Sequence, residues 1–363
     1  MHNSKLHPLV VTPLCSYTIA SKSISFSLGL PVMSLRKNSP ISVMATEVAS
    51  APVTPPPSHE AVRKYGRATW LETPRLLFFH ELPFWQQDNE HILSGYRPTS
   101  GSAWTSFTSL LYVNNQTVNK YSHLFGALIF LLLPFHFHHD IFPWQPNAQK
   151  EDVLVVSIYC VGVAVCFIFS TIFHVLWNHS HDVSRFCNKL DYLGILVLMW
   201  GAGIPTIYYG FICNHSLRIM YWTMTTSTAL CCTIFTLTPA FVTPEYRKIR
   251  ASFYAGFGLS SIIFVVHGLI LHGWELQKSR MSLVWMGWMA TANLVGALIY
   301  AARIPERWVP YTFDNFGASH QILHVAVMIA AWIHFRGLME AFHTIRSQND
   351  ICRGVYRVDH GGL

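Results

Sequence analysis

Three histidines have the residue type and the spacing of metal ligands. His320 and His324 are four residues apart in one apolar stretch, and His174 lies near the end of another. Residues four apart lie on one side of a helix, so both imidazoles of the pair can bind one ion. Three imidazoles with an open fourth position form a ligand set of catalytic zinc, whose bound water has a pKa of about 7. The sequence therefore predicts a Zn²⁺ site at His174, His320 and His324.

Two further polar residues accompany these histidines. Ser170 lies one helical turn before His174, and Asp191 lies near the start of the next apolar stretch. An ionisable group inside a bilayer costs about 2.5–3.5 kcal/mol on insertion scales, so each one needs a partner or a function. We expect Asp191 to hold the attacking water or to act as a general base. We expect Ser170 to support the site or to polarise a substrate carbonyl group. A single buried histidine is more often structural, and that alternative stands for each residue taken alone.

The elements that must position these residues are long apolar stretches. They lie at about 121–137, 153–176, 190–211, 220–241, 252–272, 281–301 and 319–341. Each is close to the roughly 20 residues that span a bilayer as a helix. The sequence thus predicts an all-α, polytopic membrane protein built as a seven-transmembrane-helix bundle. In that bundle the end of the second helix and the starts of the third and seventh share one membrane face, which brings the polar residues together.

The composition supports membrane burial. Of the 363 residues, 51% are hydrophobic and only 12% are charged, whereas about 25% are charged in an average soluble domain. The net charge of +7 is spread between the apolar stretches and the tails, which argues against nucleic-acid binding. The eight cysteines show no CxxC spacing, so the sequence predicts neither a disulfide framework nor a thiolate zinc site.

The chain divides into four regions. We predict a disordered tail with a Pro-rich linker at 1–64 and a cytosolic juxtamembrane segment at 65–120, with an amphipathic helix over 104–119. The seven-helix membrane domain then covers 121–342, and a C-terminal tail covers 343–363. The Lys and Arg residues of the loops predict a cytosolic N-terminus. The predicted zinc site then faces the cytosol, in a multi-pass protein of the plasma membrane or an endomembrane.

Four short motifs resemble the progestin and adipoQ receptor family. This family includes the adiponectin receptors, haemolysin III-like proteins and fungal zinc-homeostasis members, and the resemblance favours the fungal zinc-homeostasis branch. It covers about residues 75–342. The motifs are Asn115-Gln-Thr-Val-Asn-Lys-Tyr-Ser-His123, Ser170-Thr-Ile-Phe-His174, Lys189-Leu-Asp-Tyr-Leu-Gly-Ile195 and Ser319-His-Gln-Ile-Leu-His324.

The resemblance implies seven helices, a cytosolic N-terminus and zinc held by His174, His320 and His324, with Asp191 contacting the metal through water. Ser170 occupies the matching serine position. One departure is Gln116, because the family usually has a glutamate there. That position lies outside the predicted metal ligands, and the departure puts a supporting electrostatic contact in doubt.

Three functions remain open at this stage. One is a zinc-dependent lipid amidohydrolase that attacks ceramide-like amides with activated water, as the resemblance to adiponectin receptors implies. The second is a non-enzymatic receptor or a zinc and lipid-homeostasis regulator with a structural zinc. The third is a non-hydrolytic enzyme that acts on another lipophilic metabolite. In each, the expected partner is a membrane lipid or a lipophilic small molecule, and the sequence identifies no protein partner.

Overall fold

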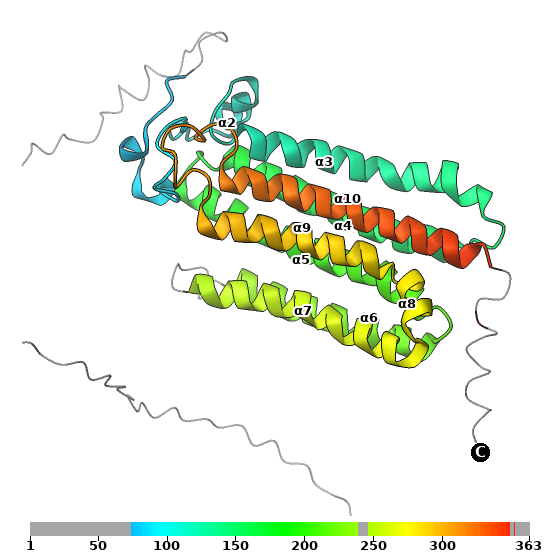
Figure 1. Cartoon of the computed structure of the whole chain (residues 1–363). Coiled ribbons are helices and arrows are strands. Elements are labelled where there is room, and N and C mark those ends of the chain that lie inside the picture. Colours follow the sequence, from blue (N-terminus) through cyan, green and yellow to red (C-terminus); the bar gives the residue numbers. More distant parts are fainter. Residues whose placement is uncertain (1–73, 239–245, 349–351, 353–363) are drawn as a thin grey trace, which may run out of the picture. The chain divides into compact units, whose positions relative to one another are not determined.

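The computed structural model describes residues 74–238, 246–348 and 352. The predicted tail and linker at 1–64 lie outside these residues, as do the start of the predicted juxtamembrane segment and most of the predicted C-terminal tail. Over the described residues the chain is largely helical, and its long helices lie side by side in one bundle (Figure 1). The fold class predicted from the apolar stretches is therefore confirmed as all-α.

The helices of the described residues follow the predicted stretches in order. They are α2 (Ala103–Thr108), α3 (Thr117–His136), α4 (Lys150–Leu176), α5 (His181–Gly210), α6 (His215–Leu237), α7 (Arg247–His272), α8 (Trp274–Arg280), α9 (Leu283–Ala302) and α10 (Ser319–Arg346). Helix α5 begins about nine residues earlier than predicted, at His181, because the polar residues before the apolar stretch are also helical. Asp191 is therefore about three turns inside α5, and not near its start.

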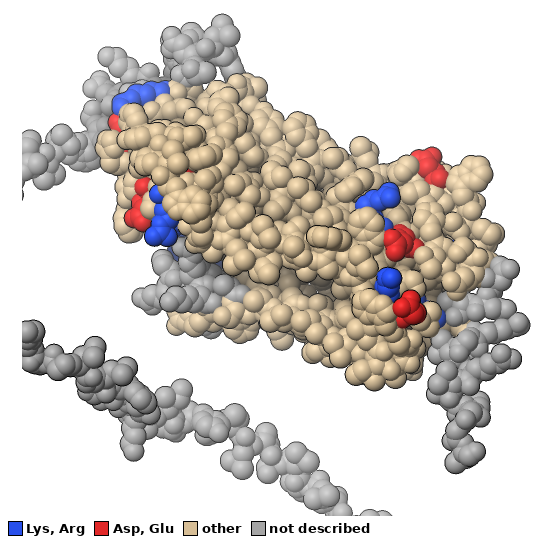
Figure 2. All heavy atoms as spheres, in the orientation of Figure 1, with Lys and Arg blue, Asp and Glu red and all other residues tan. Residues whose placement is uncertain are grey.

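Six helices of the described residues are long and apolar enough to cross a membrane: α3, α4, α5, α7, α9 and α10. Helix α6 has the length, at 23 residues, but it is rich in Ser and Thr. Such hydroxyls can be satisfied within the helix, as in the 2.9 Å hydrogen bond from Thr228 Oγ1 to the Met224 carbonyl oxygen. In Figure 2 the charged residues of the visible face gather toward the two ends of the bundle, with a broad uncharged band between them. The chain is thus a multi-pass membrane protein.

Helix α4 lies at the centre of the packing. Small residues let it approach α5 closely, as is common between membrane helices. A Cβ atom placed on Gly194 of α5 would lie 2.8 Å from the Cys166 Cα atom of α4. On its other side α4 is tied to α10, because the Tyr159 hydroxyl donates a 2.6 Å hydrogen bond to the Ala331 carbonyl oxygen.

At one end of the bundle, α4 and α10 are joined by a buried ion pair. Arg346 contacts both carboxylate oxygens of Asp152 at 2.8 and 3.0 Å, and the two side chains are 3% and 0% exposed. The same guanidinium donates a 3.0 Å hydrogen bond to the Tyr208 hydroxyl of α5. A buried bidentate contact of this kind fixes the relative orientation of the two side chains and also pairs their charges.

The same end of the bundle carries a disulfide bond. Cys213, in the connection between α5 and α6, is bonded to Cys352, with 5.5 Å between the Cα atoms. The prediction that the cysteines form no disulfide framework is therefore wrong for this pair. The two residues are 139 positions apart, so only the threading of the intervening helices brings them together. We call this the disulfide end of the bundle.

At the opposite end, the predicted amphipathic helix at 104–119 is much shorter than expected. Helix α2 ends at Thr108, a 3₁₀ turn follows to Leu111, and α3 begins only at Thr117. The Asn114 side chain explains the break, because its amide donates hydrogen bonds to the carbonyl oxygens of Ser109 and Tyr112. An asparagine that bonds its own neighbourhood in this way competes with the helix. We call residues 74–116 the cap.

Candidate metal centre

Three histidines from two helices meet beside the cap. His174 lies in the last turn of α4, and His320 and His324 lie in the first two turns of α10. One ring nitrogen of each lies within 4.8 Å of those of the other two. His174 and His324 are buried, and His320 is partly exposed. The structure therefore brings together the three residues that the sequence singled out, and this histidine group could hold a metal ion.

The closest approach within the group is between His174 and His324. Their Nε2 atoms are 3.1 Å apart. A tetrahedral zinc with bonds of about 2.05 Å separates its nitrogen ligands by about 3.3 Å. This pair already has that spacing, and His320 has to approach by at most about 1.5 Å to complete the set. The donor set and its geometry thus fit a zinc ion.

Gln116 of the cap contacts the histidine group directly. Its side-chain oxygen Oε1 lies 2.8 Å from His174 Nδ1 and also accepts a 2.8 Å hydrogen bond from Asn119 Nδ2. The sequence had placed Gln116 outside the site and left its electrostatic role in doubt, so this contact was missed. The available signal was the family motif itself, in which the position differs from the usual glutamate.

Arg97 of the cap holds the end of α4. Its guanidinium donates hydrogen bonds to the carbonyl oxygens of His174 at 2.6 Å and Val175 at 2.8 Å. A helix C-terminus carries a partial negative charge and unpaired carbonyl groups, which a cation satisfies. Burial lowers the Arg97 pKa to about 10, so the side chain stays charged at neutral pH. The sequence offered no signal for this contact beyond the presence of an arginine.

Glu306 holds the N-terminal end of α10, as Arg97 holds the C-terminal end of α4. Its carboxylate accepts a 2.8 Å hydrogen bond from the Ser319 main-chain nitrogen and a second from the Ser319 hydroxyl. A carboxylate at a helix N-terminus is stabilised by the exposed N–H groups and the helix dipole. Asn89 of the cap donates a 3.1 Å hydrogen bond to Glu306. The first turn of α10, which carries His320, is thereby fixed to the cap.

Ser170 lies one turn before His174 on α4, and its side chain lies close enough to Asp191 of α5 to interact with the Asp191 carboxyl group. Asp191 is not among the residues whose ligand atoms lie within 4.8 Å of one another. The close contact of Gly194 with Cys166 is one turn from both residues, so it sets their separation.

A fourth imidazole lies against the group without joining it. The His123 ring stacks on His324 with 3.9 Å between the ring centroids, and on Phe167 at 4.5 Å. Within the described part of the chain neither His123 ring nitrogen has a partner at hydrogen-bond distance, and the residue is 5% exposed. His123 therefore supports the His324 ring from its face. The sequence had included it in a family motif but assigned it no role.

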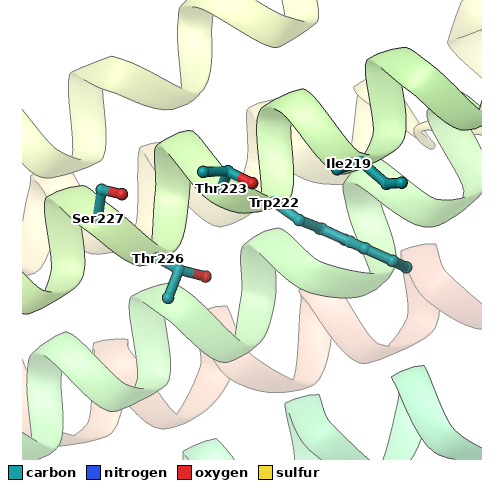
Figure 3. Close-up of a pocket in the computed structure, with 5 residues that line it drawn as sticks. All are labelled: Ile219, Trp222, Thr223, Thr226 and Ser227. Carbon is teal, nitrogen blue, oxygen red and sulfur yellow. The ribbon is translucent and has the colours of Figure 1, made fainter.

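A hollow of about 330 Å³ lies elsewhere, along α6. Figure 3 shows the residues that line it, which all belong to that helix: Ile219, Trp222, Thr223, Thr226 and Ser227. Two of them are used for packing, because Trp222 donates to the Ile204 carbonyl oxygen and Thr226 accepts from Trp200. The five residues that line the hollow include no titratable side chain.

Comparison with known proteins identifies the family of this chain. Haemolysin-III related proteins match residues 111–335, which include the histidine group, Gln116, Ser170 and Asp191. The chain is 36% identical to "Adiponectin receptor protein" of Drosophila melanogaster, over 78% of this chain and 62% of that protein. It therefore spans less than two thirds of that receptor.

Other relatives are covered more completely. The chain is 35% identical to "ADIPOR-like receptor IZH2" of Saccharomyces cerevisiae, over 75% of this chain and 85% of that protein. It is 33% identical to "Heptahelical transmembrane protein 1" of Arabidopsis thaliana, over 73% and 80% of the two chains. The chain belongs to the haemolysin-III related family of membrane proteins, together with the adiponectin receptors and ADIPOR-like receptors.

Proposed function

We propose that this protein is a zinc-dependent lipid amidohydrolase whose site is the histidine group with Ser170 and Asp191. The observation that carries the proposal is the meeting of three imidazoles, one of which lies a helical turn after Ser170 on α4. Zinc is the favoured ion because an all-imidazole set with one open position suits it. The substrate class, ceramide-like lipid amides, follows from the resemblance to adiponectin receptors.

The roles of the residues follow from their positions. A zinc ion bound at this site would polarise a carbonyl oxygen and lower the pKa of water to about 7. Asp191 accepts the proton of the attacking water and returns it to the departing amine nitrogen, so the products are a fatty acid and an amine. Ser170, whose side chain interacts with the Asp191 carboxyl group, orients that group. No covalent enzyme intermediate is needed.

The orientation in the membrane is part of the proposal. The disulfide between Cys213 and Cys352 belongs in an oxidising compartment, outside the cytosol. The histidine group lies at the opposite end of the bundle, and so do the cap and the basic residues of the predicted inner loops. These observations support the proposal of seven crossings with a cytosolic N-terminus and a cytosol-facing site, in the plasma membrane or an endomembrane. A lipid substrate then reaches the site laterally from the inner leaflet.

The second candidate is a receptor or homeostasis regulator in which zinc is structural. The fly and yeast relatives are both named as receptors, which favours this candidate. In that case the metal ties α4 to α10 and no bond is broken. The two candidates share the metal site and differ only in turnover.

Metal analysis of the detergent-purified protein tests the site. We expect about one zinc per chain in the wild type and none in His320→Ala. His139→Ala is the matched control, because His139 is exposed and precedes α4, outside the histidine group, so it should keep the metal. An unchanged zinc content in His320→Ala contradicts the assignment.

Turnover separates the two functions. Asp191→Asn should retain zinc and fold but lose the release of fatty acid from ceramide-like amides. If the zinc-loaded wild type releases no fatty acid from any lipid amide, the hydrolase is ruled out and the receptor reading stands.

A further inference from the structure

Gln116 makes the hydrogen bond that decides which nitrogen of His174 carries its proton. A carboxamide oxygen can only accept hydrogen bonds, whereas its nitrogen can only donate. Gln116 Oε1 accepts a 2.8 Å hydrogen bond from Asn119 Nδ2, so in this arrangement of the two amides the atom facing His174 is an oxygen. The alternative arrangement reverses both amides together, because Asn119 Oδ1 makes no other hydrogen bond. It would put an N–H donor against His174 Nδ1 and leave the hydrogen on Nε2, where it blocks metal binding, so the proposed metal site requires the arrangement with the oxygen.

The fixed oxygen has a consequence for the imidazole. His174 Nδ1 lies 2.8 Å from Gln116 Oε1, so Nδ1 must carry the hydrogen that this bond requires. A neutral imidazole has only one N–H group, so Nε2 keeps a free lone pair. That lone pair belongs to the atom 3.1 Å from His324 Nε2, which faces the centre of the histidine group.

We propose that Gln116 is a positioning residue that holds His174 in the Nδ1–H tautomer and thereby sets the affinity of the site for its metal. This inference rests on the proposed function, because it concerns the same metal site. Among the described residues, the second ring nitrogen of His324 makes no such hydrogen bond to a side chain. His174 is the member of the group whose second ring nitrogen contacts a side chain of the cap.

The chemical nature of Gln116 tunes the strength of the ligand. A carboxylate at this position would attract the Nδ1 hydrogen more strongly and so increase the electron density of the imidazole ring. Nε2 would then bind a metal ion more strongly. The neutral carboxamide keeps the geometry but omits the charge. The site should therefore bind zinc more weakly, and release it more readily, than the same site with a glutamate.

Three variants separate geometry from packing. Gln116→Leu fills similar space but removes the acceptor, and Gln116→Glu keeps an acceptor and adds charge. Gln145→Leu is the matched control, since Gln145 Nε2 makes a 2.8 Å contact with a histidine ring nitrogen, His343 Nδ1. That Gln–His pair is exposed and joins the segment before α4 to the last turn of α10, so its loss should leave the zinc affinity unchanged.

Zinc affinity is measured by competition with a chelator in detergent. Loss of a side chain that orients a metal-ligating histidine typically weakens binding about 10–100-fold, and we expect that loss in Gln116→Leu. Gln116→Glu should bind at least as tightly as the wild type. The inference is overturned if Gln116→Leu binds like the wild type, or if both variants weaken binding equally.

A second measurement does not depend on metal. The ¹⁵N shifts of the His174 ring in the metal-free protein, assigned by comparison with His174→Ala, report the tautomer. We expect Nδ1–H in the wild type and a mixture of tautomers in Gln116→Leu. A wild type that binds no zinc would end the proposed function, and the ring shifts would still decide whether Gln116 sets the tautomer. A mixture of tautomers in the wild type overturns the inference.

Discussion

Arg97 Nη2 donates a 2.6 Å hydrogen bond to the carbonyl oxygen of His174, so one residue of the cap holds the main chain of a residue in the histidine group. The contact joins positions 77 residues apart. It makes the cap part of the site, because the end of α4 cannot shift without breaking hydrogen bonds to a buried cation.

Replacing Arg97 should therefore damage both stability and metal binding. Hydrogen bonds to a charged group contribute about 1.5–3 kcal/mol, and Arg97→Ala leaves two carbonyl groups of α4 without that partner. We expect a lower apparent unfolding temperature in detergent and weaker zinc binding. Arg75→Ala is the control, since Arg75 is 73% exposed in its ion pair with Glu81 and such pairs contribute little. Equal effects of the two variants would contradict this role.

Gly194 should tolerate no side chain. In Gly194→Ala the new Cβ would lie 2.8 Å from the Cys166 Cα atom, so α4 and α5 must move apart at a cost of roughly 1–3 kcal/mol. Ser170 and Asp191 then separate, and the turnover of lipid amides should fall more than the zinc content. Gly287→Ala is the matched control, because no atom lies within 4 Å of its Cβ position. Wild-type turnover in Gly194→Ala would show that the spacing of Ser170 and Asp191 is unimportant.

His123 should act through its ring face and not through its nitrogens. His123→Phe keeps the stack on His324 and should retain most of the zinc affinity. His123→Ala removes the stack and leaves space beside the His324 ring, so the affinity should fall. Chelator competition on the two variants checks the expectation. If His123→Phe loses zinc as completely as His123→Ala, then His123 binds the metal through a ring nitrogen instead.

The disulfide gives a test of orientation in sealed membranes. Cys213 and Cys352 should react with a membrane-impermeant maleimide only after reduction, and only from the exoplasmic side. The Cys213→Ser/Cys352→Ser variant supplies the background from the other cysteines. Labelling that appears only when the cytosolic side is opened would reverse the proposed topology.

The ion pair between Asp152 and Arg346 should be costly to break from one side. Arg346→Met leaves a fully buried carboxylate without its cation, and losses of about 3–5 kcal/mol are typical. Asp152→Asn/Arg346→Met removes both charges and should recover part of that loss. Thermal unfolding of the three proteins measures the effect, and a double variant as unstable as Arg346→Met would argue against an uncompensated charge as the cause.

The sequence predicted the helices and the meeting of the histidines, because both follow from apolar length and from the alternation of membrane faces. Helical periodicity was enough to predict that His320 and His324 lie on one side of a helix. The order in which the chain crosses the membrane was enough to predict that His174 lies at the same face. The contacts of Arg97 and Gln116 could not be predicted in this way. They depend on how an irregular segment folds over the bundle, and irregular segments carry no periodic signal.

Two errors have the same physical origin. The break after α2 is decided by local hydrogen bonds of Asn114, which outweigh the apolar spacing at 104–119. The pairing of Cys213 with Cys352 depends on where the end of α10 emerges relative to α5. In both cases the outcome depends on one or two particular side chains, whereas the sequence argument averaged the apolar character of many residues.

Helices α4 and α10 are fastened at three depths: by Asp152 with Arg346, by Tyr159 with the main chain of α10, and by the histidine group. Only the last of these fastenings calls for an ion. Chelation should therefore empty the site without unfolding the bundle. If the site binds zinc as proposed, the protein can load and unload the ion repeatedly during its lifetime, and its occupancy would follow the free zinc of the surrounding compartment and not the supply at the moment of synthesis.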